Sequence, residues 1–171
     1  KKLTNLVRPH IGVITNIGEA HIENFKNIHG IAKAKSEIIE HIIPGGTIIL
    51  NRDDKFFKFL SKKAKTYGIK ISTFGINKQS DICLKKIVKN ENALKILVQI
   101  DNKTTSLQIG DLNINNILSS VAVLKELDID ISKIKNNFKN LKSSAGRGRK
   151  YLISRYKKKF KLIDESYNAN P

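Results

Sequence analysis

Short apolar segments alternate with helical patterns over the first 75 residues, and this alternation leaves few possible folds. Residues 11–16, 47–50 and 70–74 are short runs rich in β-branched and apolar residues, which is typical of strands buried in a parallel sheet. Residues 29–43 have helical spacing, and residues 54–67 form a lysine-rich helical segment. This order predicts an α/β fold with a mostly parallel sheet flanked by helices.

The pattern changes after residue 75. Residues 81–88, 94–100 and 104–109 alternate apolar with polar residues, which predicts a small antiparallel β meander. Four further elements are expected: helices over 113–127 and 131–141, and strands over 151–155 and 161–164. The helix over 113–127 is apolar on nearly all sides, so we expect it to be buried.

The composition fits one folded domain with a strongly basic surface. The chain has 171 residues, of which 40% are hydrophobic, and its net charge is +17. Such a charge suggests nucleic-acid binding, but the lysines are spread along the chain and aromatic residues for base stacking are few. The one dense run, Lys157 to Lys159, also fits a solvated hairpin tip. A basic nucleic-acid-binding module is the alternative that this charge leaves open, and nucleic acid is not the expected partner.

Two absences bear on where this chain comes from. It contains no Met, so we expect it to be a piece of a longer protein, truncated at both ends. Its single cysteine, Cys83, cannot form an internal disulfide, which fits a reducing compartment. No segment approaches the roughly 18 apolar residues of a membrane span. A cytoplasmic protein without a membrane partner is therefore expected.

Lys35 is the most informative single residue because of the face on which helical geometry places it. At about 100° per residue, Lys35 shares one narrow stripe with Ile31, Ile38 and Ile42. A charged ammonium within an apolar face is costly, so the side chain must extend to water, meet an anion or lose its proton. A neutral amine can add carbon dioxide to form a carbamate. The alternative is an amphipathic helix whose lysine stem covers its apolar neighbours.

The loop after the first predicted strand has the sequence Asn-Ile-Gly-Glu-Ala-His over residues 16–21. Ligands of open α/β sheets gather at the carboxyl ends of strands, where this loop is expected. Glu19 and His21 are candidate metal ligands or acid–base groups, although a lone histidine is more often structural. A carbamate on Lys35 and the imidazole of His21 could together bind a hard cation.

Three later segments carry polar groups suited to a nucleotide. Asn113 and Asn116 lie in the first turn of a predicted helix, where helix capping accounts for one of them. Residues 146–149, Gly-Arg-Gly-Arg, offer guanidinium groups suited to phosphate oxygens. Residues 162–171 predict a buried strand that runs into a polar cluster. This cluster resembles a ligand loop, and a turn rich in Asn and Pro is the alternative.

With these elements in this order, the chain resembles the central ATP-binding domain of the Mur ligases. The resemblance covers essentially all residues and is most specific at 16–21, at 32–37 (Ala-Lys-Ala-Lys-Ser-Glu) and at 164–171 (Asp-Glu-Ser-Tyr-Asn-Ala-Asn-Pro). The Tyr-Asn-Ala-Asn-Pro ending is similar to the members that add D-alanyl-D-alanine, rather than to sister ligases or folylpolyglutamate synthetases. Leu112 departs from the family pattern, because a histidine commonly precedes the first asparagine.

The resemblance implies a role for each candidate residue. Lys35 would become carbamylated, and His21 would hold a magnesium ion near that carbamate, with Glu19 a weaker candidate ligand. The implied nucleotide-binding residues are Asn113 and Asn116 at the adenine, Arg147 at the phosphates, Asp164 and Glu165 near the ribose, and Tyr167, Asn168 and Asn170 in the same loop. ATP and Mg²⁺ are the implied cofactors.

The implied reaction is ATP-dependent amide formation through an acyl phosphate, with UDP-N-acetylmuramoyl-tripeptide and D-alanyl-D-alanine as substrates. The chain lacks the string G-x-x-x-x-G-K-[ST] of a phosphate-binding loop. We therefore expect residues 1–171 to be a partial central domain, separated from its phosphate-binding loop, its UDP-sugar domain and its C-terminal domain. Alone, this chain is expected to be inactive and monomeric. A sister Mur ligase that adds a different amino acid is a further alternative.

Overall fold

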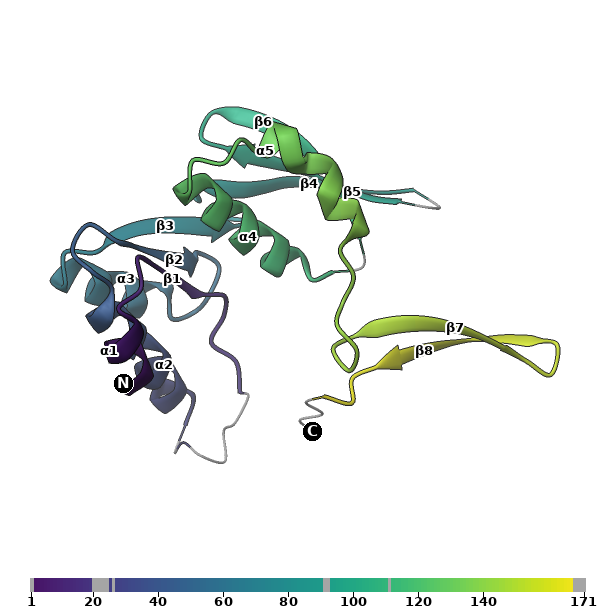
Figure 1. Cartoon of the computed structure of the whole chain (residues 1–171), viewed down its shortest axis with the longest axis horizontal. Helices are drawn as coiled ribbons and strands as arrows, with labels where there is room; N and C mark the ends of the chain where they lie inside the picture. Colours follow the sequence, from purple (N-terminus) through teal and green to yellow (C-terminus); the bar gives the residue numbers. More distant parts are fainter. Residues whose placement is uncertain (1, 20–24, 26, 91–92, 111, 168–171) are drawn as a thin grey trace.

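The computed structural model describes residues 2–19, 25, 27–90, 93–110 and 112–167 (Figure 1). Its main sheet has six strands in the order in which they occur in the chain. They are β1 (Ile11–Ile14), β2 (Thr47–Asn51), β3 (Lys70–Gly75), β4 (Ile82–Asn90), β5 (Ala93–Ile100) and β6 (Lys103–Ile109). Strands β1 to β3 are parallel, and β4, β5 and β6 form an antiparallel meander. The α/β fold class predicted from the sequence is confirmed.

The meander is part of the same sheet rather than a separate layer. Strand β4 pairs with β3 in parallel over a short stretch, where Phe74 lies opposite Ile82 and Gly75 lies opposite Cys83. Residues 76–81 make this connection without a crossover helix. The sequence pattern predicts both halves of the sheet, but it contains no signal for this short parallel junction.

Strand β2 lies at the centre of the parallel half, and all its residues are buried. Ile48 and Leu50 pack in one core cluster with residues of α2 (Ile28–Ser36) and α3 (Phe57–Thr66). Ile49 packs in a second cluster with α4 (Ile114–Glu126), on the other face of the sheet. Alternate residues of a strand point to opposite faces, which explains why the three middle residues, Ile48 to Leu50, are all apolar.

Two predicted helices change their geometry partway along. The helix expected over 29–43 is α-helical as α2 and then continues as the 3₁₀ helix η2 (Glu37–His41). The helix expected over 131–141 is a short α5 (Ile131–Ile134) followed by η3 (Lys135–Asn140). A 3₁₀ helix has three residues per turn, so a wheel drawn at 3.6 residues per turn does not describe residues beyond Ser36. A further helix, α1 (Lys2–Val7), was not predicted from the sequence.

The carboxylate of Glu126 ties the end of α4 to the start of two strands. It accepts hydrogen bonds from Thr47 Oγ1 at 3.0 Å and from Lys70 Nζ at 2.9 Å, and its side chain is 7% exposed. Burial alone would raise the pKa of Glu126, but these hydrogen bonds outweigh it and hold the pKa below the ordinary value of 4.5. Glu126 therefore stabilises the fold as a carboxylate.

Replacing Glu126 with Gln is expected to lower the free energy of unfolding at neutral pH by about 1–2 kcal/mol, since a charged acceptor is lost while Lys70 stays largely in water. A lowered pKa gives stability that is present above the unfolded value and is lost as pH falls through the folded value. The difference between wild type and variant should therefore shrink below about pH 4.5, the ordinary value. Urea titrations at several pH values measure this, and a pH-independent difference would contradict it.

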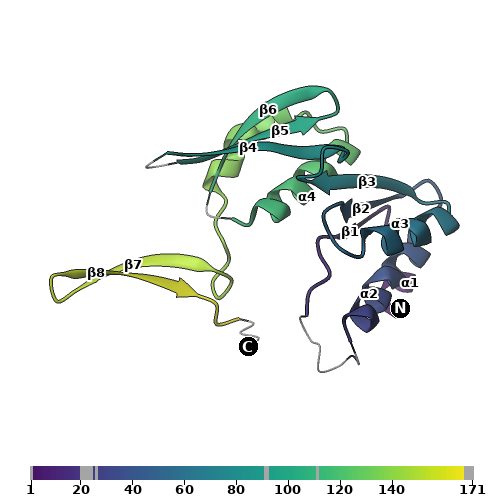
Figure 2. The same ribbon diagram turned by 180° about the vertical axis from the view of Figure 1, so that it is seen from behind.

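The last two strands form a hairpin that stands apart from the main sheet in both views (Figures 1 and 2). They are β7 (Arg149–Arg155) and β8 (Lys158–Asp164). The strand predicted over 161–164 is present within β8, but the expectation that it is buried is wrong, because Leu162 and Ile163 are 49% and 53% exposed. Their apolar character suggested burial. The hairpin lies away from the main sheet, however, and its residues are exposed along nearly all of both strands. Tyr156 and Lys157, with positive φ, form the tip of this hairpin, while Lys158 and Lys159 lie in β8.

None of the helices in the described part of the chain has the length and apolar character needed to cross a membrane.

Candidate functional site

The loops that leave the carboxyl ends of the parallel strands hold the first group of candidate residues. Residues 15–19 follow β1, and within them Ile17 is buried while Asn16 and Glu19 are exposed. Asn51 at the end of β2 donates its side-chain amide to the carbonyl oxygen of Thr15 at 3.2 Å. The predicted ligand loop therefore begins at the sheet edge where ligands of open α/β folds bind.

Lys35 reaches this loop. Its Nζ donates a hydrogen bond to the carbonyl oxygen of Asn16 at 3.0 Å. Lys35 is exposed, whereas Ile31 on the same helical stripe is 2% exposed. The long side chain therefore extends out of the apolar face and ends on a main-chain oxygen at the sheet edge. Of the three outcomes expected from the sequence, extension of the side chain toward solvent fits this exposure.

Of the residues that the resemblance implies for a magnesium site, only Lys35 and Glu19 lie in the described part of the chain. Glu19 lies three residues after Asn16, and His21 lies outside the described residues. In the described ranges no three or more His, Cys, Asp or Glu side chains group as metal ligands. An accessible amine that could carry a carbamate, beside a loop with a carboxylate, fits the oxygen donors that Mg²⁺ prefers.

The second group of candidate residues is brought together at the base of the β7–β8 hairpin. The Gly146 amide donates to Asp164 Oδ2 at 2.8 Å, and the Tyr167 amide donates to the carbonyl oxygen of Gly146 at 3.0 Å. The guanidinium of Arg147 stacks on the ring of Tyr167, 4.2 Å from its centroid. Gly146 has a φ of +75°, and a Cβ there would lie 2.8 Å from the Tyr167 nitrogen, so the close approach requires glycine.

The two acidic candidates at this base differ in what surrounds them. The carboxylate of Asp164 accepts from the Ser166 hydroxyl at 2.6 Å and from the Ser166 amide at 3.1 Å, besides the Gly146 amide. These hydrogen bonds, led by the one from the Ser166 side chain, hold the pKa of Asp164 below its ordinary value. Asp164 therefore shapes the loop. Glu165 is exposed, and its Oε1 lies over Gly148.

The α4 helix start holds the remaining described candidates. Asn113 is the N-cap, and its side-chain oxygen accepts from the Asn115 amide at 2.9 Å, so helix capping accounts for this residue. The side chain of Asn116 is exposed on the first turn. A cavity of about 280 Å³ lies between Gly110, which precedes this helix, and the hairpin base. Its lining includes Lys139, Lys142, Arg149 and Lys150. Asn168 and Asn170 lie outside the described residues.

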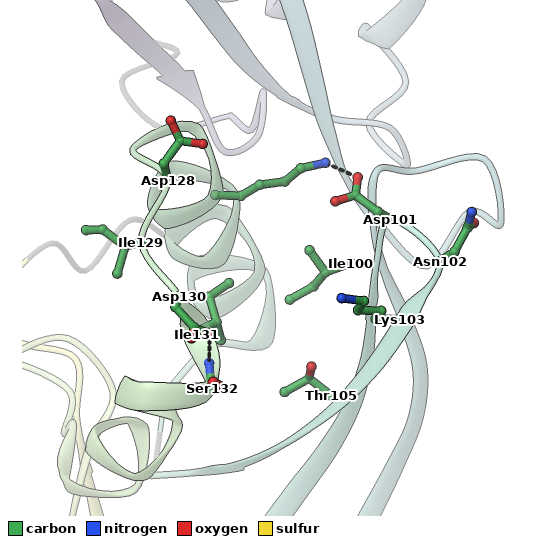
Figure 3. Close-up of a pocket in the computed structure, with 11 residues that line it drawn as sticks. Ile100, Asp101, Asn102, Lys103, Thr105, Asp128, Ile129, Asp130, Ile131 and Ser132 are labelled. Atoms are coloured by element: carbon green, nitrogen blue, oxygen red, sulfur yellow. Dashed lines mark hydrogen bonds and ion pairs between the residues drawn. The ribbon is translucent and has the colours of Figure 1, made fainter.

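A larger cavity, of about 660 Å³, lies elsewhere and contains none of the predicted site residues (Figure 3). It lies between the β5–β6 turn and the α4–α5 turn. Lys125 pairs with Asp101 across it, and Asp130 accepts from the Ser132 amide at 2.9 Å as the cap of α5. The charged groups named here are used in an ion pair and a helix cap. The larger size of this cavity is therefore not enough to make it the candidate functional site.

The turn between β2 and α3 contains polar residues that the sequence reasoning treated only as the end of a strand. Asn51, Asp53 and Asp54 each bind main-chain groups of neighbouring loops. The available signal was a run of polar residues directly after a buried strand, at the edge where the ligand loop was already expected.

Comparison of this sequence with protein families and with known proteins gives Mur ligases in each case. Residues 1–124 match the family model of the Mur ligase middle domain. The UDP-N-acetylmuramoyl-tripeptide–D-alanyl-D-alanine ligase of Buchnera aphidicola is 29% identical over 170 residues, which are 98% of this chain and 36% of that protein. The UDP-N-acetylmuramoylalanine–D-glutamate ligase of Listeria innocua is 32% identical over 127 residues, 74% of this chain and 27% of that protein.

Solved structures that resemble this chain also include Mur ligases. The crystal structure of MurF from Acinetobacter baumannii superposes with a TM-score of 0.83 at 28% identity, covering 98% of this chain and 36% of that one. The chain thus spans about a third of the length of these relatives. Mur ligases are ATP-dependent ligases, and the resemblance seen in the sequence motifs agrees with these matches. Because the family model matches most of its length, the chain belongs to the Mur ligase middle-domain family.

Proposed function

We propose that this chain is part of the central ATP-binding domain of a ligase that joins D-alanyl-D-alanine to UDP-N-acetylmuramoyl-tripeptide, a step of peptidoglycan precursor synthesis. The observation that carries the proposal is the Lys35 amine, 3.0 Å from the loop that leads to Glu19, at the carboxyl edge of a Mur ligase sheet. The near-complete alignment with tripeptide ligases supports this substrate pair over that of a sister ligase, whose match covers 74% of the chain.

The proposed chemistry at Lys35 begins with its exposed amine. As a neutral amine it adds to carbon dioxide, one proton leaves the nitrogen, and the side chain ends in a carbamate with two oxygen donors. Lys35 as carbamate and His21, with Glu19 as a weaker candidate, would hold Mg²⁺. The ion would supply positive charge near phosphate oxygens and near the carboxylate that is to be activated.

The hairpin base is proposed to bind the nucleotide. Stacking on Tyr167 holds the Arg147 guanidinium by its face, which leaves the edge that carries its N–H donors for phosphate oxygens. Glu165 is exposed and is proposed to meet the ribose, with Asp164 shaping the loop beneath it. Asn116 and the cavity of about 280 Å³ beside the α4 start are proposed to lie near the adenine. Tyr167, Asn168 and Asn170 are proposed to belong to the same nucleotide-binding loop as Asp164 and Glu165.

The carbamate is tested directly with [¹³C]bicarbonate. A carbamate carbon resonance is expected in the 171-residue chain at mildly alkaline pH, and it should vanish in Lys35→Arg, because a guanidinium does not form a stable carbamate. Lys33→Arg, on the same helix and also exposed, is the matched control and should keep the signal. A carbamate signal that survives Lys35→Arg would contradict the proposal.

Activity is tested with ATP, the tripeptide precursor and D-alanyl-D-alanine. The full-length protein that carries this domain should release phosphate and form the amide product, whereas the 171-residue chain alone should do neither. If the 171-residue chain alone turned over ATP faster than its Lys35→Ala variant, the proposal that activity requires the full-length protein would be contradicted. A product formed only with another amino acid would favour a sister ligase.

A monomeric state and a cytoplasmic location belong to the same proposal. The net charge of +17 opposes self-association, and the thiol of Cys83 is buried and free. A steep salt dependence of DNA or RNA binding near physiological salt would instead favour the basic nucleic-acid-binding module.

A further inference from the structure

Three consecutive residues after β1 are each held by a side chain from another element. This segment, residues 15–17, connects the strand to the loop of Glu19. Its three contacts are Asn51 Nδ2 to the Thr15 oxygen at 3.2 Å, Lys35 Nζ to the Asn16 oxygen at 3.0 Å, and the Ile17 nitrogen to Asp54 Oδ2 at 2.7 Å. The position of the loop beside Lys35 is therefore set from outside the loop itself.

The Asp54 contact is the shortest of the three. While one carboxylate oxygen of Asp54 accepts from Ile17, the other accepts from the Phe56 amide at 2.8 Å, just before α3. Ile17 is 5% exposed, so the peptide that Asp54 binds is packed into the core. A carboxylate that accepts main-chain amides makes a stronger hydrogen bond than a neutral acceptor does. Asp54 thus links the segment to the residue that precedes α3.

The Lys35 contact becomes weaker in the proposed chemistry. An ammonium donates to the Asn16 oxygen with one of three N–H groups, whereas a carbamate nitrogen keeps a single N–H and carries two acceptor oxygens beside it. These oxygens repel the Asn16 oxygen, so carbamylation weakens this contact. The contacts of Asn51 and Asp54 are unaffected by this change and then hold the segment.

We propose that Asp54 is a positioning residue for the Lys35 site. Its carboxylate fixes the 15–17 segment, beside which the Lys35 side chain lies. This inference rests on the proposed function, and it assigns to Asp54 a role that depends on the Ile17 contact rather than on any contact with substrate.

Asp53 supplies a matched control within the same turn. Its Oδ2 accepts from the Ile76 amide at 2.6 Å and its Oδ1 accepts from the Asn77 amide at 3.0 Å. It therefore makes the same kind of contact with the loop after β3 instead of the loop after β1. Loss of Asp53 should weaken the fold without moving residues 15–17.

The test compares Asp54→Ala, Asp54→Asn and Asp53→Ala in the 171-residue chain, with thermal unfolding measured for each. The first readout is the carbamate resonance with [¹³C]bicarbonate and Mg²⁺. The second is the rate at which trinitrobenzenesulfonate labels Lys35, followed by peptide mass spectrometry. Asp54→Ala should lower carbamate occupancy and raise the labelling rate, each by about threefold or more, as expected for the loss of one hydrogen bond. Asp54→Asn keeps an acceptor for Ile17 and should lie closer to wild type.

Asp53→Ala should change neither readout at Lys35, even where it lowers the unfolding temperature as much as Asp54→Ala does. Equal effects of the two alanine variants would overturn the inference, because they would show general destabilisation. An Asp54→Ala variant with wild-type readouts would overturn it as well. If the wild-type chain forms no Lys35 carbamate, the proposed function fails, and the labelling comparison alone decides whether Asp54 positions Lys35.

Discussion

Phe74→Ala is expected to lower the free energy of unfolding by about 3–5 kcal/mol, the range for large-to-small aromatic substitutions in a core. Phe74 lies on β3, is fully buried, and packs in the cluster shared by the meander and α4. It also pairs with Ile82, at the short parallel junction that joins the two halves of the sheet. Truncation therefore leaves a cavity at the point where the halves meet.

Phe59→Ala is the matched control, since Phe59 is on α3 and is 43% exposed. Its loss should change the free energy of unfolding by less than about 0.5 kcal/mol, as for most surface substitutions. Urea denaturation followed by circular dichroism measures both variants. If the two variants lost similar amounts of unfolding free energy, Phe74 at the junction would contribute no more to stability than an exposed phenylalanine, which would contradict this prediction.

Gly110→Ala is expected to destabilise the chain by about 3 kcal/mol, at the upper end of the cost of overpacking. A Cβ at Gly110 would overlap the carbonyl oxygen of Leu141 and lie 3.0 Å from that of Lys139. Both neighbours are main-chain atoms, which cannot turn aside as a side chain does. The Gly110 amide also donates to the Phe138 oxygen at 3.1 Å, so the methyl group would force these paired segments apart.

Gly18→Ala is the control for this substitution, because among the described residues a Cβ there meets only the side-chain amide of Asn16, at 3.4 Å. It should be neutral or slightly stabilising, since alanine restricts the unfolded chain. Thermal unfolding of the two variants gives the comparison. The expectation for Gly110 fails if its variant unfolds at the same temperature as the Gly18 variant.

The sequence allowed the order and type of nearly every element to be predicted, because apolar spacing directly records which face of a strand or helix is covered. All residues of β2 are buried, and its middle residues Ile48, Ile49 and Leu50 form a continuous apolar run. The prediction of burial failed at β8, where the apolar residues Phe160, Leu162 and Ile163 are exposed. Composition identifies a strand there, but burial depends on what else packs against it, which local sequence does not record.

The candidate site was predictable in its parts and less so in its geometry. Loop residues 16–21 and the Gly146–Tyr167 region stood out because polar groups followed strands or glycines. The exposure of Lys35 could not be read from a helical wheel, because a four-carbon stem ends far from the face that carries its Cα. The contacts of Asp53 and Asp54 with loops more than 20 residues away depend on tertiary folding alone.

The β7–β8 hairpin has a consequence for the behaviour of this chain in solution. Both of its edges lack a neighbouring strand among the described residues, and its exposed apolar side chains include Leu152 and Phe160. Unpaired strand edges can form backbone hydrogen bonds with a strand of another copy of the chain. Lysines on these strands oppose this pairing through like-charge repulsion. That protection fades as added salt screens the lysines, so concentrated electrolyte is the condition under which this chain becomes prone to edge-to-edge aggregation.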